Sequence, residues 1–319
     1  MASARWAAMA ESGSMAAMRT MAWFHDTFGR RLSLALLYPI TTYFYLRAPE
    51  IRRASREYLE ALHASSPPGA GLGRAPTTRD SFHHLHRFAI NLLDRMVMWG
   101  GDGRSFDMRH QGSEDLYRLA HSGTGGILLG AHLGSYDMPR ALAETGGVTV
   151  NVVMFTKHAA RINAFFEQRD ASSRIRVLNL DPGSIKAGLE IKACLDRGEF
   201  VGILADRVTP GGREHPVETM FLGRPAVFPL SPFLLGCVLG RPLLVSLCVR
   251  TGDARYQTVV KTLWEGERVP RAHCEALART LLERYVRLLE DQCRHAPYEW
   301  FNLYDFWDVA TPAEEAHAA

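Results

Sequence analysis

Apolar residues at helical spacing dominate the first 100 residues of the chain. Phe82, Leu85 and Phe88 belong to such a series and predict a helix over about 78–99, and a further helix is predicted over 50–64. Between them, the Pro- and Gly-rich run at 65–73 predicts a loop, because neither helices nor strands tolerate it. We therefore expect an N-terminal helical region over residues 1–100.

The pattern changes near residue 105, where short apolar runs begin to alternate with helical stretches. Strands are predicted at 126–129, 148–155, 176–180, 200–204, 243–249 and 256–263, and helices at 113–121, 136–145, 158–170, 184–197, 229–239 and 271–294. This alternation is typical of an α/β fold with a mostly parallel central sheet flanked by helices. We assign this domain to residues 101–309 and expect a disordered tail at 310–319.

One N-terminal segment has the features of a membrane-associating helix. Residues 32–46 are mostly apolar, but the stretch is interrupted by Pro39 and is short for a membrane span. Arginines flank it, including Arg31 and Arg47, and its tyrosines suit the depth of lipid headgroups. Two interpretations stay open at this point: a helix that docks on a membrane surface, and a helix packed into the protein.

Composition narrows the function classes. A hydrophobic content of 47% with 22% charged residues indicates a folded protein, and a net charge of +3 is too small to suggest nucleic-acid binding. The five cysteines form no C-x-x-C pair, which argues against a zinc ribbon and against a disulfide scaffold. Because the N-terminus also lacks a secretory signal, we expect the protein to work in a reducing compartment.

The clearest candidate for chemistry follows the apolar run 126–130. His132 stands at the expected end of this strand, and Asp137 comes five residues later, at the start of the next predicted helix. Strand ends are where α/β sheets place their active sites. A turn between the two residues would let Asp137 bind one ring nitrogen and leave the other to act as a base. A structural histidine followed by a helix-capping aspartate is the alternative.

The remaining sequence signals for cofactors and metals are weak. His83, His84 and His86 cluster in the helix predicted over 78–99, but no matching ligand spacing accompanies them. We interpret these three residues as a solvated helix face and expect no metal site. A nucleophile elbow, a phosphate-binding P-loop and a dinucleotide fingerprint are all missing from the sequence, so no cofactor is expected.

Four stretches together resemble one enzyme family. His132 to Asp137 fits the H-x4-[D/E] signature of the lysophospholipid acyltransferase superfamily, and its surroundings are most similar to the branch of bacterial lipid A biosynthesis acyltransferases. Further motifs of that branch are resembled, in order, by the strand 200–204 with Asp206, by 221–226 with 240–244, and by the aromatic tail 297–307. The resemblance covers most of residues 20–307. The sequence departs from the branch in three places: after the second strand, at Asp137, where the branch often has Glu, and at Arg207. Together these departures suggest a divergent acceptor.

The resemblance implies acyl transfer from a thioester, carried by acyl carrier protein or by coenzyme A, to a hydroxyl of a lipid or glycolipid acceptor. It implies His132 as the general base oriented by Asp137, and backbone N–H groups around Gly134 and Ser135 as donors to the developing oxyanion. Further candidate substrate-binding residues are Arg161, Asn163, Asp206, Arg207 and Gly223.

The same resemblance implies a location in the cell and leaves two alternative functions open. Enzymes of this kind commonly carry an N-terminal membrane anchor, so we expect the cytoplasmic face of a bacterial inner membrane, with peripheral binding or N-terminal anchoring. One alternative is an acyl thioesterase or lipid hydrolase that uses the same His132 and Asp137 to activate water. The other is a non-catalytic, membrane-associated acyl-binding protein, for which His132 would be dispensable.

Overall fold

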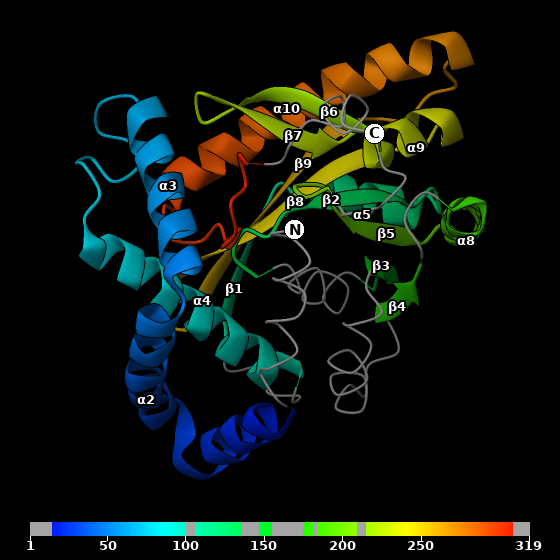
Figure 1. Ribbon diagram of the computed structural model, residues 1–319. Coiled ribbons are helices and arrows are strands. Elements are labelled where there is room, and N and C mark those ends of the chain that lie inside the picture. Colours follow the sequence, from blue (N-terminus) through cyan, green and yellow to red (C-terminus); the bar gives the residue numbers. More distant parts are fainter. Residues whose placement is uncertain are drawn as a thin grey trace, which may run out of the picture.

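A seven-stranded sheet forms the centre of the protein (Figure 1). The computed structural model describes residues 15–99, 106–135, 147–154, 175–180, 184–208 and 215–308. The strand order is β1 (Asp107–Gln111), β9 (Arg255–Trp264), β8 (Leu243–Gly252), β2 (Gly126–Gly130), β5 (Phe200–Leu204), β3 (Val150–Met154) and β4 (Ile175–Asn179). From β8 to β4 all neighbours are parallel, whereas β9 is antiparallel to β8 and parallel to β1. The predicted fold class, α/β with a mostly parallel central sheet flanked by helices, is confirmed.

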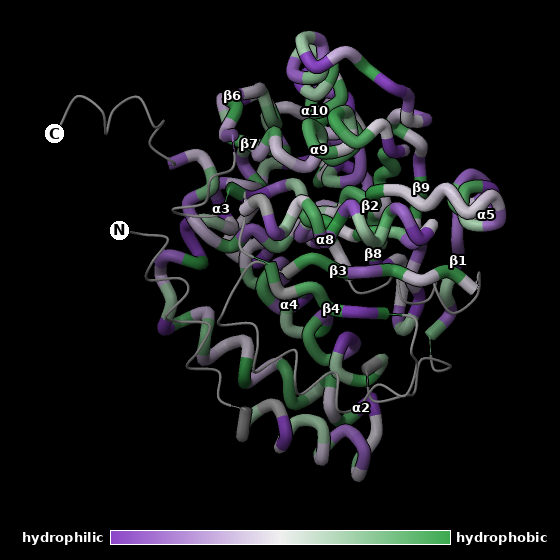
Figure 2. The backbone as a smooth tube through the Cα atoms, turned by 90° about the vertical axis from the view of Figure 1, so that its right-hand side faces the viewer, coloured by the Kyte–Doolittle hydropathy of each residue, from purple (hydrophilic) through white to green (hydrophobic). Residues whose placement is uncertain are grey.

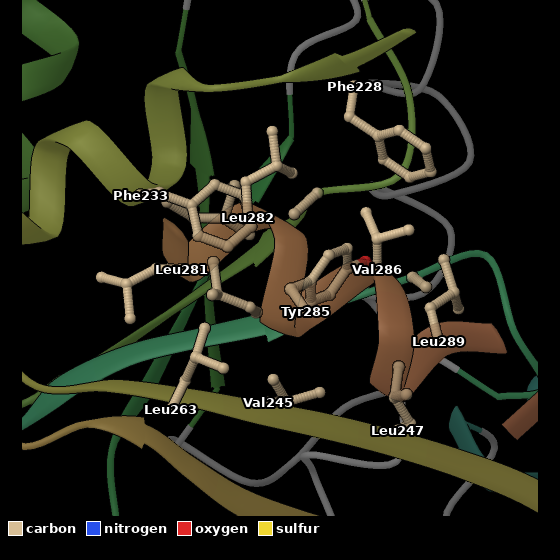
Figure 3. Close-up of a cluster of buried hydrophobic side chains, with 14 of the residues drawn as sticks. Phe228, Phe233, Val245, Leu247, Leu263, Leu281, Leu282, Tyr285, Val286 and Leu289 are labelled. Carbon is tan, nitrogen blue, oxygen red and sulfur yellow. The ribbon is translucent and has the colours of Figure 1, made fainter. Parts of the chain in front are cut away.

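Helices cover both faces of the sheet because its central strands are apolar on both sides. Ile127 and Leu129 of β2 belong to the core that α8 (Ile185–Asp196), α9 (Ser231–Leu239) and α10 (Arg271–His295) share. Leu128, which points the other way, packs in a separate cluster with α5 (Glu114–His121). Figure 3 shows the first of these cores, with residues of α10 such as Leu282 and Tyr285 lying over β8.

The N-terminal region consists of α2 (Met15–Arg47), α3 (Pro49–Ser65) and α4 (Thr78–Trp99), at the left of Figure 1. Gly29 interrupts α2 with a positive φ of 77°, so that two helical segments meet at a kink. One side of α2 packs against α4 through residues such as Leu37. None of the helices in the described residues is long and apolar enough to cross a membrane.

The predicted elements agree with the structure where the chain is buried. The six predicted strands are β2, β3, β4, β5, β8 and β9, and the helices predicted over 50–64, 78–99, 113–121, 184–197, 229–239 and 271–294 are α3, α4, α5, α8, α9 and α10. In Figure 2 the central strands are largely green, whereas α2 alternates between hydrophilic and hydrophobic residues. The predictions missed β1 and the antiparallel hairpin of β6 (Pro216–Phe221) and β7 (Arg224–Pro229). The predicted helices 136–145 and 158–170 and the predicted tail 310–319 lie outside the described residues.

Candidate active site

Two neighbouring parallel strands bring His132 and Asp206 together, although 74 residues separate them. β2 and β5 are in register with Gly130 opposite Leu204, and Ala205 extends the pairing by donating its N–H to the Gly130 carbonyl at 3.0 Å. His132 and Asp206 each lie two residues beyond that register pair. Nδ1 of His132 and Oδ1 of Asp206 are 2.8 Å apart. The carboxyl ends of these strands therefore form the site that α/β topology predicts.

Asp206 is a buried carboxylate with both oxygens occupied. Its side chain is 0% exposed, whereas that of His132 is 21% exposed, so only the imidazole is open to a substrate. Oδ1 faces the ring, and Oδ2 accepts hydrogen bonds from the His132 backbone N–H (2.9 Å), Trp300 Nε1 (3.1 Å) and Asn302 Nδ2 (3.1 Å). Three donors therefore fix Oδ2, which orients Oδ1 toward the His132 ring.

The electrostatics of the pair indicate a neutral imidazole bound to an ionised carboxylate. Burial lowers the pKa of His132, as does the positive charge of Arg207, while Asp206 opposes the change. Burial works against ionisation of Asp206, but attraction to His132 and the hydrogen bonds outweigh it, so the pKa of this carboxyl is lowered. A neutral ring that faces a carboxylate must donate its Nδ1–H, which places the lone pair on Nε2.

The loop after His132 is held by backbone pairing with distant parts of the chain. The Gly134 N–H donates to the Glu299 carbonyl (2.6 Å), and the Ser135 N–H donates to the Cys248 carbonyl (2.9 Å). Gly134 has a φ of +59°, and a Cβ there would lie 1.9 Å from the Cys248 carbonyl oxygen. For these two N–H groups the predicted role as oxyanion donors is therefore wrong, because both are already hydrogen-bonded to backbone carbonyls.

The hydroxyl of Ser135 is a different case from its N–H. Ser135 is 2% exposed, and its Oγ is buried without a hydrogen-bond partner within the part of the chain that the structure describes. A buried polar atom of this kind carries a free-energy cost unless something binds to it. Ser135 therefore stays a candidate for substrate contact through its side chain.

The other predicted site residues fall into two groups. Asp137, Arg161 and Asn163 lie outside the described residues, so their roles stay predictions. Arg207 and Gly223 are described in the structure. Gly223 lies in the turn between β6 and β7 with a φ of +75°, a conformation that explains the glycine by itself.

Arg207 is turned toward the C-terminal segment that follows α10. Its Nε donates to Asn302 Oδ1, one Nη donates to the Phe301 carbonyl at 3.0 Å, and its guanidinium stacks on the ring of Tyr304. The backbone of this segment also pairs with the site, since the Phe301 N–H donates to the His132 carbonyl at 2.7 Å. The C-terminal segment thus touches His132, Asp206 and Arg207 together.

Comparison with known protein families assigns the chain that carries this site. The chain matches the family of bacterial lipid A biosynthesis acyltransferases over residues 86–308. It belongs to that family. The matched range includes both strand ends and the C-terminal segment, and membership indicates acyl transfer to a lipid, with an acyl donor and a lipid acceptor as partners. No curated protein matches the chain.

Sequence reasoning missed how the C-terminal segment and α4 of this acyltransferase-family member support the site. Three histidines of α4 were predicted to form a solvated helix face. His83 is exposed as predicted, but the prediction is wrong for His84 and His86, which are 0% and 4% exposed. Burial lowers the pKa of each of these two to about 4, so both rings are neutral. His84 donates from Nε2 to the Trp300 carbonyl (2.8 Å) and accepts from the Ser55 hydroxyl at Nδ1 (3.0 Å).

These contacts give the buried histidines a structural role. His84 ties α3 and α4 to the segment that holds Asp206, and His86 pairs with Thr41 of α2 at 3.1 Å. The described residues contain no group of three or more His, Cys, Asp or Glu side chains that could hold a metal ion. The sequence pointed to the C-terminal segment only through the aromatic residues of 297–307. It did not indicate which residues of the site this segment contacts.

Proposed function

We propose that this member of the family transfers a fatty acyl chain from an acyl thioester, carried by acyl carrier protein or coenzyme A, to a hydroxyl of a lipid or glycolipid acceptor. The observation that carries the proposal is the pair of His132 and Asp206, with the ring partly exposed and its Nδ1 held 2.8 Å from a buried carboxylate. A base of this kind suits deprotonation of a hydroxyl. In this proposal Asp206 orients the ring, and Asp137 remains a further candidate in the same site.

The reaction balances with these groups alone. Nε2 of His132 takes the proton of the acceptor hydroxyl as its oxygen attacks the thioester carbonyl, and the carbonyl electron pair moves onto oxygen. When that pair returns, the C–S bond breaks, and the imidazolium gives its proton to the departing thiolate. Asp206 stabilises the imidazolium in between. The Ser135 hydroxyl is our candidate donor to the oxyanion, since the neighbouring backbone N–H groups are engaged.

Thiol release from acyl carrier protein and coenzyme A thioesters tests the proposal. Wild-type protein and His132→Gln are compared with and without a bacterial lipid extract, and His121→Gln, which alters an exposed histidine of α5, serves as the matched control. We expect release that depends on the extract, that is lost in His132→Gln and that is kept in His121→Gln. Release without extract would instead indicate a thioesterase. Thioester binding without release, unaffected by His132→Gln, would indicate the acyl-binding alternative.

We also propose that α2 docks on the cytoplasmic surface of a bacterial inner membrane. Among the described residues, seven of the eleven exposed large hydrophobic side chains lie on this helix: Trp23, Phe28, Leu32, Tyr38, Tyr43, Phe44 and Leu46. Exposed Arg31 and Arg47 add positive charge beside them, which suits anionic headgroups. Such a location would bring a lipid hydroxyl to His132 from the bilayer.

Sedimentation with vesicles that contain anionic lipid tests this location. We expect the protein to sediment with the vesicles and a triple variant of Tyr43, Phe44 and Leu46 to serine to stay in the supernatant. A matched control replaces Leu189 and Val238, which are exposed on α8 and α9, by serine and should sediment normally. Equal sedimentation of the triple variant and the control would contradict docking through α2.

A further inference from the structure

Asn302 lies between the two charged residues that follow β5. Its side chain is buried, with the residue 1% exposed. Its Nδ2 donates to Asp206 Oδ2 at 3.1 Å, and its Oδ1 accepts from Nε of Arg207. One amide group therefore touches an anion with its donor end and a cation with its acceptor end. Asp206 and Arg207 carry opposite charges and are consecutive in the chain, and Asn302 contacts both.

Asp206 and Arg207 act on His132 in opposite senses. The carboxylate favours the charged imidazolium, whereas the guanidinium disfavours it. If Arg207 turned toward the buried carboxylate, the ion pair would compete with Nδ1 of His132 for Oδ1. In the structure the guanidinium is held away, on Asn302 and on the Phe301 carbonyl. Asn302 thus contacts both charged residues that act on the imidazole.

Other charged or titratable groups lie on the elements packed around the loop that carries His132. On the described elements around His132 they are Arg95 of α4, Glu299 and Tyr304 of the C-terminal segment, Tyr285 of α10 and Cys248 of β8. Burial raises the pKa of the two phenols and the thiol, so these three stay neutral near pH 7. Burial also raises the pKa of Glu299 to about 7, so this group changes charge in the range of interest.

We propose that Asn302 is a positioning residue: it holds Asp206 against Nδ1 of His132 and keeps Arg207 on the C-terminal segment, an inference that rests on the proposed role of His132 as base. Trp300 supports the same oxygen of Asp206 from its indole N–H. Asn302 differs from Trp300 because it also binds Arg207. The residue therefore controls how the two opposite charges are divided around the catalytic ring.

Nitrogen-15 NMR of histidine-labelled protein tests this role without any substrate. The His132 ring signals are assigned from their loss in His132→Gln, and their titration is followed in wild type and in Asn302→Asp. Aspartate is nearly isosteric, still accepts from Arg207, and places a second carboxylate beside Asp206. We expect the titration midpoint of His132 to rise by about one pH unit. A repeat in a Glu299→Gln background removes the other nearby group that titrates near neutrality.

A second variant and a control keep the test decisive if Asn302→Asp does not fold. Asn302→Leu has a similar volume but no polar atoms, so Arg207 loses its acceptor and Asp206 loses one donor. We expect the Nδ1-protonated tautomer to lose its dominance and acyl transfer to fall between about tenfold and a hundredfold, as for one lost charge-assisted hydrogen bond. Leu303→Ala alters the next residue, which is buried against Tyr45 and Leu85, and should change neither the titration nor the tautomer.

The outcomes separate this inference from the proposed function. If His132 titrates in Asn302→Asp as in wild type, or keeps its tautomer in Asn302→Leu, the inference is overturned. If both ring signals change as expected and no acceptor is acylated by wild-type protein, the positioning role stands and the acyl-transfer proposal fails. A matching shift in the pH profile of thiol release would support both.

Discussion

Replacement of Asp206 by asparagine exchanges one buried carboxylate oxygen for an NH2 group and is expected to abolish turnover while leaving the fold in place. Three donors converge on Oδ2, namely the His132 backbone N–H, Trp300 Nε1 and Asn302 Nδ2. Among the described residues, Oδ1 faces the His132 ring alone. The amide oxygen of the variant should therefore take the Oδ2 position. Its NH2 group then faces Nδ1, so the ring must accept there and carry its proton on Nε2.

The size of both effects follows from this geometry. A ring with its proton on Nε2 cannot accept the proton of the acceptor hydroxyl, and a change of this kind lowers turnover by roughly 10³ to 10⁴, or about 4–5 kcal/mol. The fold loses the charge on three hydrogen bonds, at roughly 1 kcal/mol each. A total of about 3 kcal/mol is less than the stability of a typical domain and corresponds to a melting temperature lower by about 6 °C.

Steady-state transfer assays and thermal unfolding, run on the same preparations, check this prediction. Asp80→Asn is the matched control, because Asp80 is a 3% exposed carboxylate that accepts hydrogen bonds from Arg74, Thr77 and Tyr298 instead of from a catalytic histidine. It should lower the melting temperature by a similar amount and keep turnover. If Asp206→Asn retains more than about a tenth of wild-type turnover, the assignment of Asp206 as the group that orients His132 is refuted.

Three further predictions follow from the described contacts. Because burial and Arg207 lower the pKa of His132, the acid limb of kcat/KM should lie below the ordinary histidine value of 6.5, and Arg207→Leu should move it to higher pH in a rate profile between pH 4.5 and 8. Gly134→Ala should lower the free energy of unfolding by roughly 2–4 kcal/mol in urea, since its Cβ would meet a β8 carbonyl, whereas Gly202→Ala, whose Cβ meets only ordinary contacts, should cost less. The folded pKa of Glu299, about 7, lies above its ordinary value of 4.5, so the native state holds the extra proton between these values and loses stability as the pH rises through them. Glu299→Gln should remove that loss, and equal melting-temperature changes between pH 5 and pH 8 in variant and wild type would contradict this.

The sequence predicts the buried part of the fold well because burial imposes a simple pattern. β2, β5 and the first seven residues of β8 are mostly apolar and buried, and these strands were predicted to within a few residues of their ends. β1 and β6 were missed, since both alternate exposed and half-buried residues and contain charged side chains. Such strands depend on their pairing partner more than on their own composition, and that partner is not visible in a local window.

In the candidate site, hydrogen bonds to residues distant in the sequence decide what each group can do. His132 was identified from its place at a strand end, but the fate of the neighbouring N–H groups depends on Cys248 and Glu299, more than 100 residues away. For His84, a polar residue on a helix predicted exposure, and the structure instead pairs it with a carbonyl at residue 300. In each case a long-range backbone partner decides the outcome. The aromatic tail supplies much of that partnership, and its role becomes visible only when the chain is folded.

The pairing of His132 with Asp206 is the instructive case, because both residues were candidates and only their neighbourhood was unknown. In a parallel pair, residues at equal offsets beyond a register pair lie opposite each other, and both residues are two positions beyond the pair of Gly130 and Leu204. Consecutive strands are neighbours more often than not, so the chain order favours β3 beside β2. The sheet instead inserts β5 between them. The contact between Nδ1 and Asp206 thus follows from the equal distance of the two residues from the ends of β2 and β5. The spacing between His132 and Asp137 along the chain carries no information about this contact.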